Sequence, residues 1–298
     1  MAGSGRRTDT VGDRTPGGGC LNTSRYQRSP FNRGSLLLHA GAVAAAAAWP
    51  ELWKASTLAV VGNHAALTTF GLIPRSSILG RNITRLPDTD ANRSAVAITI
   101  DDGPHPVATP KVLDILDEYD AKATFFCIGE HVLNCPDIAQ EIVRRGHRIE
   151  NHSMHHSHLF SVPFVGRLQR EVMAAQDAIY KTTGQLPRFF RAPAGLRNFL
   201  LDRVLQRSDL QLTSWTRRGF DTVNTDANSV AKRLVTELKP RDILLLHDRP
   251  TILVTARSSA PIDLIAPILL ALPVVLQSLR AHALAAVTLH ESIPPTLQ

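Results

Sequence analysis

The chain has 298 residues, of which 44% are hydrophobic and 20% charged, so it can form one large α/β domain with extensions, or two small domains. The net charge is +7, but residues 1–35 carry six Arg and two Asp, so +4 of that excess lies in the N-terminal tail. We find no base-stacking aromatic residues interleaved with Arg or Lys, and we therefore expect no nucleic-acid partner. Three cysteines without CxxC spacing do not describe a disulfide framework.

The N-terminal third differs in composition from the rest. Residues 1–35 have no hydrophobic period, which predicts a disordered basic tail. Residues 36–75 are an apolar helical segment of two stretches, each shorter than the ~20 residues that cross a bilayer. Joined as a hairpin, with Trp49 and Trp53 near an interface, they could anchor the chain to a membrane. The alternative is a pair of helices packed on the domain.

These two alternatives leave the location open. About 35 polar residues precede the first apolar stretch, so no cleavable signal peptide is visible. A basic tail favours a cytoplasmic N-terminus; one crossing would then place the domain outside and two would keep it inside. We expect a protein of the bacterial cell envelope or inner membrane, with its side and its oligomeric state undetermined.

After a linker at 76–94, the pattern becomes an alternation of short apolar runs and amphipathic segments. We expect strands at 96–100, 123–128, 148–150, 189–190, 210–215, 243–246 and 287–289. We expect helices at 110–119, 138–145, 168–183 and 230–238, and an apolar helical region at 262–283 that is broken at Pro267 and Pro273. Alternating strands and helices predict a parallel α/β sheet or barrel over 95–298.

Reactive side chains follow several of these strands, where parallel barrels build their active sites. Asp101 and Asp102 end the first strand and are followed by Gly103-Pro104. Adjacent carboxylates disfavour each other unless a cation or an Arg compensates them. The structural alternative, which an isolated Asp-Asp-Gly favours, is an Asx-type turn.

A histidine cluster follows the third strand. His152 and His156 are four residues apart, so on a helical turn they could share a face and bind one metal ion. A solvated His-rich loop is the alternative. His155 and His158 lie in the same segment, so spacing alone does not fix the pair.

Two further strand ends carry polar groups. Arg191, before Pro193, could hold one carboxylate ionised, and a backbone N–H in the Ala194–Gly195 bend could face an oxyanion. His247 follows four apolar residues, and a nearby carboxylate could raise its pKa for general-acid work. The alternatives are a surface Arg and a histidine satisfied in the core.

In this order, the four elements resemble the polysaccharide deacetylase family, which is carbohydrate esterase family 4 with its NodB homology domain. The resemblance covers about Ala95 to Leu289, and it implies a distorted, incomplete (β/α) barrel. The matching motifs are Thr99-Ile100-Asp101-Asp102-Gly103-Pro104, His152-Ser153-x-x-His156, Arg191-x-Pro193-x-Gly195 and Leu245-x-His247.

The resemblance implies a role for each of these residues. Asp102, His152 and His156 would bind one divalent metal ion, with Zn²⁺ first and Co²⁺, Ni²⁺ or Mn²⁺ as alternatives. Asp101 would be the general base, oriented by Arg191, and the substrate would be an acetylated glycan.

The other implied roles concern the sugar and the leaving group. His247 would protonate the amine, supported by Asp221, and the N–H of Ala194 would stabilise the oxyanion. The residues expected to contact the sugar are Ala194, Gly195, Leu245 and Trp215. The sequence departs from the family pattern in two places: Thr222 follows Asp221 where relatives often have Trp, and many relatives have an aromatic residue in place of Ala194.

Three functions are compatible with these residues. The first is removal of acetyl groups from N-acetylglucosamine glycans of chitooligosaccharide or peptidoglycan type, or from another acetylated glycan. The second is a catalytically weak sugar-binding relative, against which the presence of Asp101 argues. The third is another metal-dependent hydrolase such as a phosphoesterase, although no second complete set of metal ligands is visible.

Overall fold

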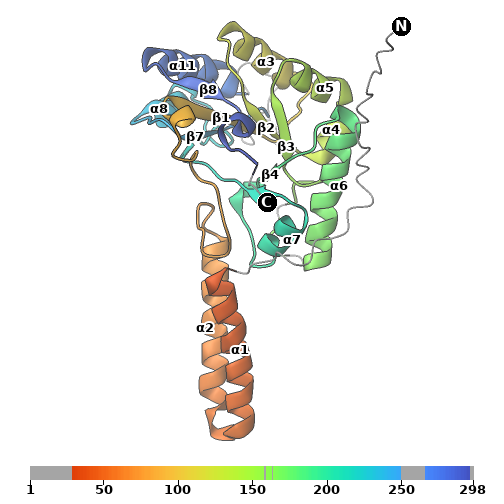
Figure 1. Ribbon diagram of the computed structural model, residues 1–298, viewed down its shortest axis with the longest axis vertical. Coiled ribbons are helices and arrows are strands. Elements are labelled where there is room, and N and C mark those ends of the chain that lie inside the picture. Colours follow the sequence, from red (N-terminus) through yellow and green to blue (C-terminus); the bar gives the residue numbers. More distant parts are fainter. Residues whose placement is uncertain (1–28, 158, 163, 250–265, 296–298) are drawn as a thin grey trace, which may run out of the picture.

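The computed structural model describes residues 29–157, 159–162, 164–249 and 266–295 (Figure 1). The predicted disorder of residues 1–28, His158 of the histidine cluster, and residues 262–265 of the last predicted helix lie outside these ranges.

A parallel sheet forms the centre of the molecule. Its strands are β1 Ala95–Asp101, β2 Thr124–Cys127, β3 Arg148–Asn151, β4 Phe189–Phe190, β5 Gln211–Leu212, β6 Arg217–Arg218, β7 Ile243–His247 and β8 Ala285–Val287. The strand order is β5-β4-β3-β2-β1-β7-β6, with β8 paired to the first half of β1. The sheet curls into a half-barrel with helices around it, as Figure 1 shows. The predicted incomplete (β/α) barrel is confirmed.

The central strand β1 divides its side chains between two environments. Val96, Ile98 and Ile100 belong to the core between the sheet and the surrounding helices. Ala97 belongs to a second core inside the half-barrel, which includes Phe126, Phe189, Trp215 and Leu245. Because strand side chains alternate between faces, Asp101 shares the inner face with Ala97. The alternation therefore directs this carboxylate into the mouth of the barrel.

Helices cover the sheet, and those at 108–118, 136–144, 165–183, 227–235 and 268–281 correspond to predicted helical segments, whereas the three short ones at 129–134, 201–207 and 289–292 were not predicted. The helices are α3 Ala108–Glu118, α4 Gly129–Asn134, α5 Pro136–Arg144, α6 Val165–Thr183, α7 Leu201–Arg207, α8 Ala227–Val235, α11 Ile268–Ala281 and α12 Leu289–Ser292. Local signals set several ends: Pro136 opens α5, Asp226 caps α8, and Gly184 ends α6 in the left-handed region at φ 72°.

Four expectations differ from the structure. The closing strand predicted at 287–289 is β8 Ala285–Val287, and α12 begins at Leu289. α11 continues through Pro273, because its buried apolar face packs on the sheet and offsets the missing backbone hydrogen bond. The predicted strand 210–215 is only Gln211–Leu212; Thr213 continues as a single bridge to Ile83, and the carbonyls of Thr213 and Ser214 accept hydrogen bonds from Arg191. The predicted tail boundary at residue 35 is also late, since Ser29 caps a helix that begins at Pro30.

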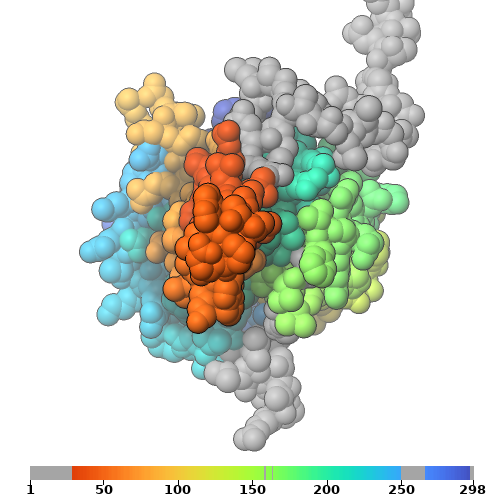
Figure 2. Space-filling model, turned by 90° about the horizontal axis from the view of Figure 1, so that it is seen from below, coloured from red at the N-terminus to blue at the C-terminus, as the bar shows by residue number. Residues whose placement is uncertain are grey.

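The predicted apolar segment forms a helical hairpin that projects from the domain, α1 Pro30–Ala48 and α2 Trp53–Gly71 (Figure 1). Figure 2 shows this hairpin end-on. The helices join through Asn63, which donates to Ser35 at 2.7 Å, and the base meets the barrel where Arg197 N–H donates to the Gly71 carbonyl. Only its base packs on the domain, so neither predicted arrangement holds in full.

The hairpin exposes its apolar side chains on several sides. Leu37, Val43 and Leu58 are each more than 70% exposed, and Trp49 and Trp53 are 57% and 56% exposed near the tip. Within the described residues, no helix has both the length and the apolarity that crossing a bilayer requires, which gives no support to the predicted membrane anchor.

Candidate metal and catalytic site

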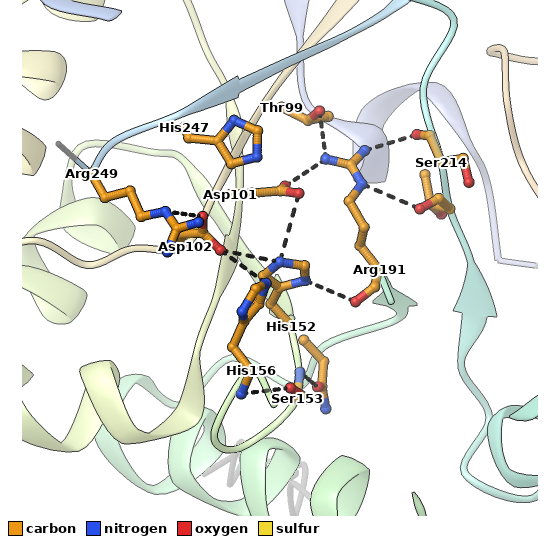
Figure 3. Close-up of polar contacts among 12 residues, drawn as sticks. Thr99, Asp101, Asp102, His152, Ser153, His156, Arg191, Ser214, His247 and Arg249 are labelled. Carbon is orange, nitrogen blue, oxygen red and sulfur yellow. Dashed lines mark hydrogen bonds and ion pairs between the residues drawn. The ribbon is translucent and has the colours of Figure 1, made fainter. Parts of the chain in front are cut away.

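The predicted site residues meet at one edge of the half-barrel. Asp101 ends β1 opposite His247, which ends β7, and His152 follows β3 directly. Arg191 follows β4, whose Phe190 pairs with Asn151 of β3. Since parallel strands present their carboxyl ends at the same edge, the chain brings these side chains together from far apart in sequence (Figure 3).

Asp102, His152 and His156 form a group able to hold a metal ion. Their ligand atoms all lie within 4.8 Å of one another. The Oδ1 atom of Asp102 lies 3.4 Å from Nε2 of His152 and 3.3 Å from Nε2 of His156. His155, the competing histidine, is 57% exposed and pairs with Glu171 instead. The geometry thus selects the predicted pair.

The protonation of this group fits a cation. The Arg191 carbonyl accepts a hydrogen bond from Nδ1 of His152 at 2.8 Å, so in the neutral ring Nε2 presents a lone pair to Asp102. Oδ1 of Asp102 is buried and accepts no hydrogen bond from any described residue. Burial, assisted by His152, lowers the pKa of His156 to about 4, so its ring is neutral at pH 7. A cation between these atoms would satisfy all three.

The backbone at this group is strained. Asp102, Ser153, His156 and Ala194 adopt positive φ values of 75°, 64°, 47° and 53°, a region that non-glycine residues rarely enter. Such strain persists where the surrounding structure imposes it, and it clusters at functional sites. The spacing of His152 and His156 predicted that they share a face of a helical turn. In the structure both lie in a loop instead.

Asp101 belongs to a separate network with Arg191. Nη1 of Arg191 donates to Asp101 Oδ1 at 2.6 Å and to Thr99 Oγ1 at 2.8 Å. Nε and Nη2 donate to the carbonyls of Thr213 and Ser214, and the group lies 4.1 Å from the centre of the Phe126 ring. Arg191 is 1% exposed and Asp101 is 3% exposed, so this ion pair is shielded from solvent.

His247 is held by Asp221, as the sequence predicted. Oδ1 of Asp221 lies 2.9 Å from Nδ1 of His247, and Oδ2 accepts the backbone N–H of the same residue at 2.6 Å. Burial alone would lower the pKa of His247, but the Asp221 carboxylate outweighs it and raises the pKa to about 9. His247 is therefore protonated at neutral pH and can donate a proton from the site.

The residues expected to contact the sugar differ in exposure. Ala194 is exposed, whereas Gly195 is buried, Trp215 is 7% exposed and Leu245 is 2% exposed. A Cβ on Gly195 would lie 2.6 Å from Pro74 and 2.8 Å from Trp215, so this glycine allows the chain after the hairpin to pack on the site. Contact of these four residues with sugar stays a prediction.

Two residues of the site were missed at the sequence level. Arg249 places Nε 2.7 Å from Oδ2 of Asp102, opposite the histidines (Figure 3). Asp248 is fully buried beside Gly103; burial raises its pKa to about 7, and Thr109 donates a hydrogen bond to it. They are the two residues after His247, but no spacing rule points from them to the end of β1, which lies far earlier in the chain.

Comparison with known proteins agrees with this geometry. The sequence profile of the polysaccharide deacetylase family matches residues 88–213. A peptidoglycan-N-acetylglucosamine deacetylase of Bacillus cereus is 35% identical over 159 residues, which cover 53% of this chain and 74% of that protein. A chitooligosaccharide deacetylase of Bradyrhizobium sp. is 34% identical over 162 residues, which cover 54% and 73%.

A solved structure of a carbohydrate esterase has a similar fold. A family 4 carbohydrate esterase from Streptomyces lividans, solved in complex with acetate, superposes with a TM-score of 0.58 at 25% identity. The match covers 67% of this chain and 95% of that one. The chain belongs to the polysaccharide deacetylase family.

Proposed function

We propose that this protein is a divalent-metal-dependent deacetylase that hydrolyses the N-acetyl group of N-acetylglucosamine glycans. One observation carries the proposal: Asp102, His152 and His156 converge within 4.8 Å, beside a carboxylate, Asp101, that stays outside the group. Two imidazoles and one carboxylate suit Zn²⁺ and leave positions open for water and substrate. The two deacetylases compared above support the amide-hydrolase activity.

In the proposed reaction Asp101 acts as the general base. A metal ion held by the group would polarise the acetamide carbonyl and acidify water. Arg191 binds Oδ1 of Asp101 at 2.6 Å, while Oδ2 lies 3.7 Å from His152, on the side of the metal group. The arginine fixes one oxygen and leaves the other to take a proton from the attacking water.

His247 supplies the second proton transfer. Collapse of the tetrahedral intermediate needs a proton on the departing sugar nitrogen, and His247 carries one at neutral pH because Asp221 raises its pKa to about 9. The backbone N–H of Ala194, an exposed residue, would stabilise the oxyanion, and Leu245 would line the pocket for the acetyl methyl group. Acetate and a free amine are the products.

The substrate we propose is a peptidoglycan or chitooligosaccharide type of glycan. Thr222 and Ala194 are small where relatives often carry aromatic residues, which favours a wide sugar groove. A wide groove would accept a branched or substituted chain more readily than a narrow one.

Acetate release tests the activity. The metal-free protein is incubated with N-acetylglucosamine oligomers or with peptidoglycan fragments, with and without Zn²⁺ or Co²⁺. We expect acetate only after metal addition. Metal binding without acetate from any of these glycans would favour a sugar-binding protein, and turnover of a phosphate ester without acetate would favour a phosphoesterase.

A further inference from the structure

Arg249 lies against the metal group, although nothing about the reaction requires it. Its Nε is 2.7 Å from Oδ2 of Asp102, and its side chain is 30% exposed while that of Asp102 is 2% exposed. Figure 3 shows the two side chains next to each other, and the arginine is the more exposed member of the pair. An arginine keeps its charge at any physiological pH, so this contact is permanently that of a cation with an anion.

The two oxygens of Asp102 consequently face different partners. Oδ2 meets Arg249, whereas Oδ1 meets the Nε2 atoms of His152 and His156 at 3.4 and 3.3 Å. A metal ion on Oδ1 would share this one carboxylate with a fixed positive charge. Both cations draw on the same negative charge, and they repel each other across a few ångströms of partly buried space.

Arg249 is not needed to keep Asp102 in place. The backbone N–H of Asp102 donates to the Phe126 carbonyl at 3.2 Å, and the Asp102 carbonyl lies 2.8 Å from Nδ1 of His131. The residue is locked at φ 75° between buried neighbours. Loss of the arginine would remove a competing charge while the ligand stays where it is.

We propose that Arg249 sets the metal affinity of the site: its ion pair with Asp102 makes a divalent cation bind more weakly than the Asp-His-His set alone would hold it. The inference rests on the proposed metal site but concerns affinity rather than turnover. A weakened site exchanges its ion with the surroundings instead of keeping it permanently.

The test compares metal affinities of the full chain. Dissociation constants for Zn²⁺ and Co²⁺ are measured by chelator competition in the unmodified protein, Arg249→Gln and Arg249→Lys. Arg93→Gln is the matched control, because it removes the same charge from an 80% exposed side chain just before the opposite end of β1. We expect Arg249→Gln to bind about tenfold more tightly or better, and Arg249→Lys and Arg93→Gln to resemble the unmodified protein.

The sign of the change decides the question. A purely structural arginine would give weaker binding in Arg249→Gln, and that result, like unchanged affinity, overturns the inference. If Arg249→Gln does not fold, Arg249→Met carries the same expectation. Acetate release by the unmodified protein is followed in parallel: an inactive protein whose variant binds metal more tightly overturns only the deacetylase proposal, and an active protein with unchanged affinity in the variant overturns only this one.

Discussion

The barrel mouth and the helical hairpin differ in the kinds of side chain that they bury and expose. The mouth buries charged groups: Asp101, Asp102 and Arg191 are each at most 3% exposed, and each meets an opposite charge. The hairpin exposes apolar groups, with Leu37 and Leu58 more than 70% exposed. Burying charge costs free energy unless every group is paired, whereas exposed apolar side chains cost far less individually.

The contrast shows where precision is needed. The mouth positions its charged side chains through contacts from several strands, so single substitutions there should change chemistry strongly. The hairpin is held by local helix contacts and by its base, so substitutions near its tip should leave the chemistry alone. Gly195, packed between Pro74 and Trp215, is the junction between the two regions.

The largest effect should come from the base. Asp101→Asn keeps the shape of the side chain but removes the proton acceptor, so we expect turnover to fall by about 10²–10⁴-fold. Metal affinity, measured by chelator competition, should stay nearly unchanged. His152→Ala is the counterpart, because it should lower the metal affinity itself. Equal loss of metal in both variants would contradict the roles proposed for Asp101 and His152.

The next effect concerns the acid and appears in the pH profile. His247 must be protonated to act, so activity should fall as the pH rises through about 9, the pKa to which Asp221 raises it. In Asp221→Asn the carboxylate is gone and burial still lowers the pKa, so the alkaline limb of kcat/KM should move to lower pH. We expect a rate loss of about 10–100-fold near neutral pH. An unmoved limb would exclude His247 as the acid.

At the junction the expected effect is on stability. Gly195→Ala forces a side chain into φ 73° and places Cβ within 2.8 Å of Trp215. We expect the free energy of unfolding to fall by about 1–3 kcal/mol, measured by denaturant titration. Gly184→Ala is the control, because it shares φ 72° but has no atom within 4 Å of the added Cβ. Similar losses in both would attribute the effect to backbone strain alone.

The smallest effect should be at the hairpin tip. Trp49→Gln with Trp53→Gln changes two side chains that are 57% and 56% exposed. We expect less than about a twofold change in kcat/KM on a soluble oligosaccharide, because distant sites act independently. A large loss of kcat/KM would show that the hairpin takes part in catalysis. It would contradict the view that the hairpin tip and the barrel mouth act independently.

Most strands and helices of the barrel could be predicted, because they depend on apolar periodicity and on end signals that can be recognised in the local sequence. The run at 96–100 and the helix ending before Gly184 are examples. The short elements could not be predicted: β6 is only Arg217–Arg218, and two polar residues become a strand only because β7 lies alongside. Pro273 was misjudged because packing outweighs a local preference.

At the site, the motifs named the residues but not their contacts. The order of motifs identified Asp102, His152 and His156, yet His155 could be set aside only when its ring was found beside Glu171. Arg249 carried no signal, because its partner Asp102 is brought to it only by the pairing of β1 with β7.

The sequence by itself determined the residue types, their order and the strands that they follow, since these depend on local patterns of polarity and shape. Only the tertiary structure decided which atoms meet. The strands β1, β3, β4 and β7 are far apart in the chain but place their ends at one edge. Because the charged groups there are buried away from water, each depends on a partner that only the folded structure brings to it.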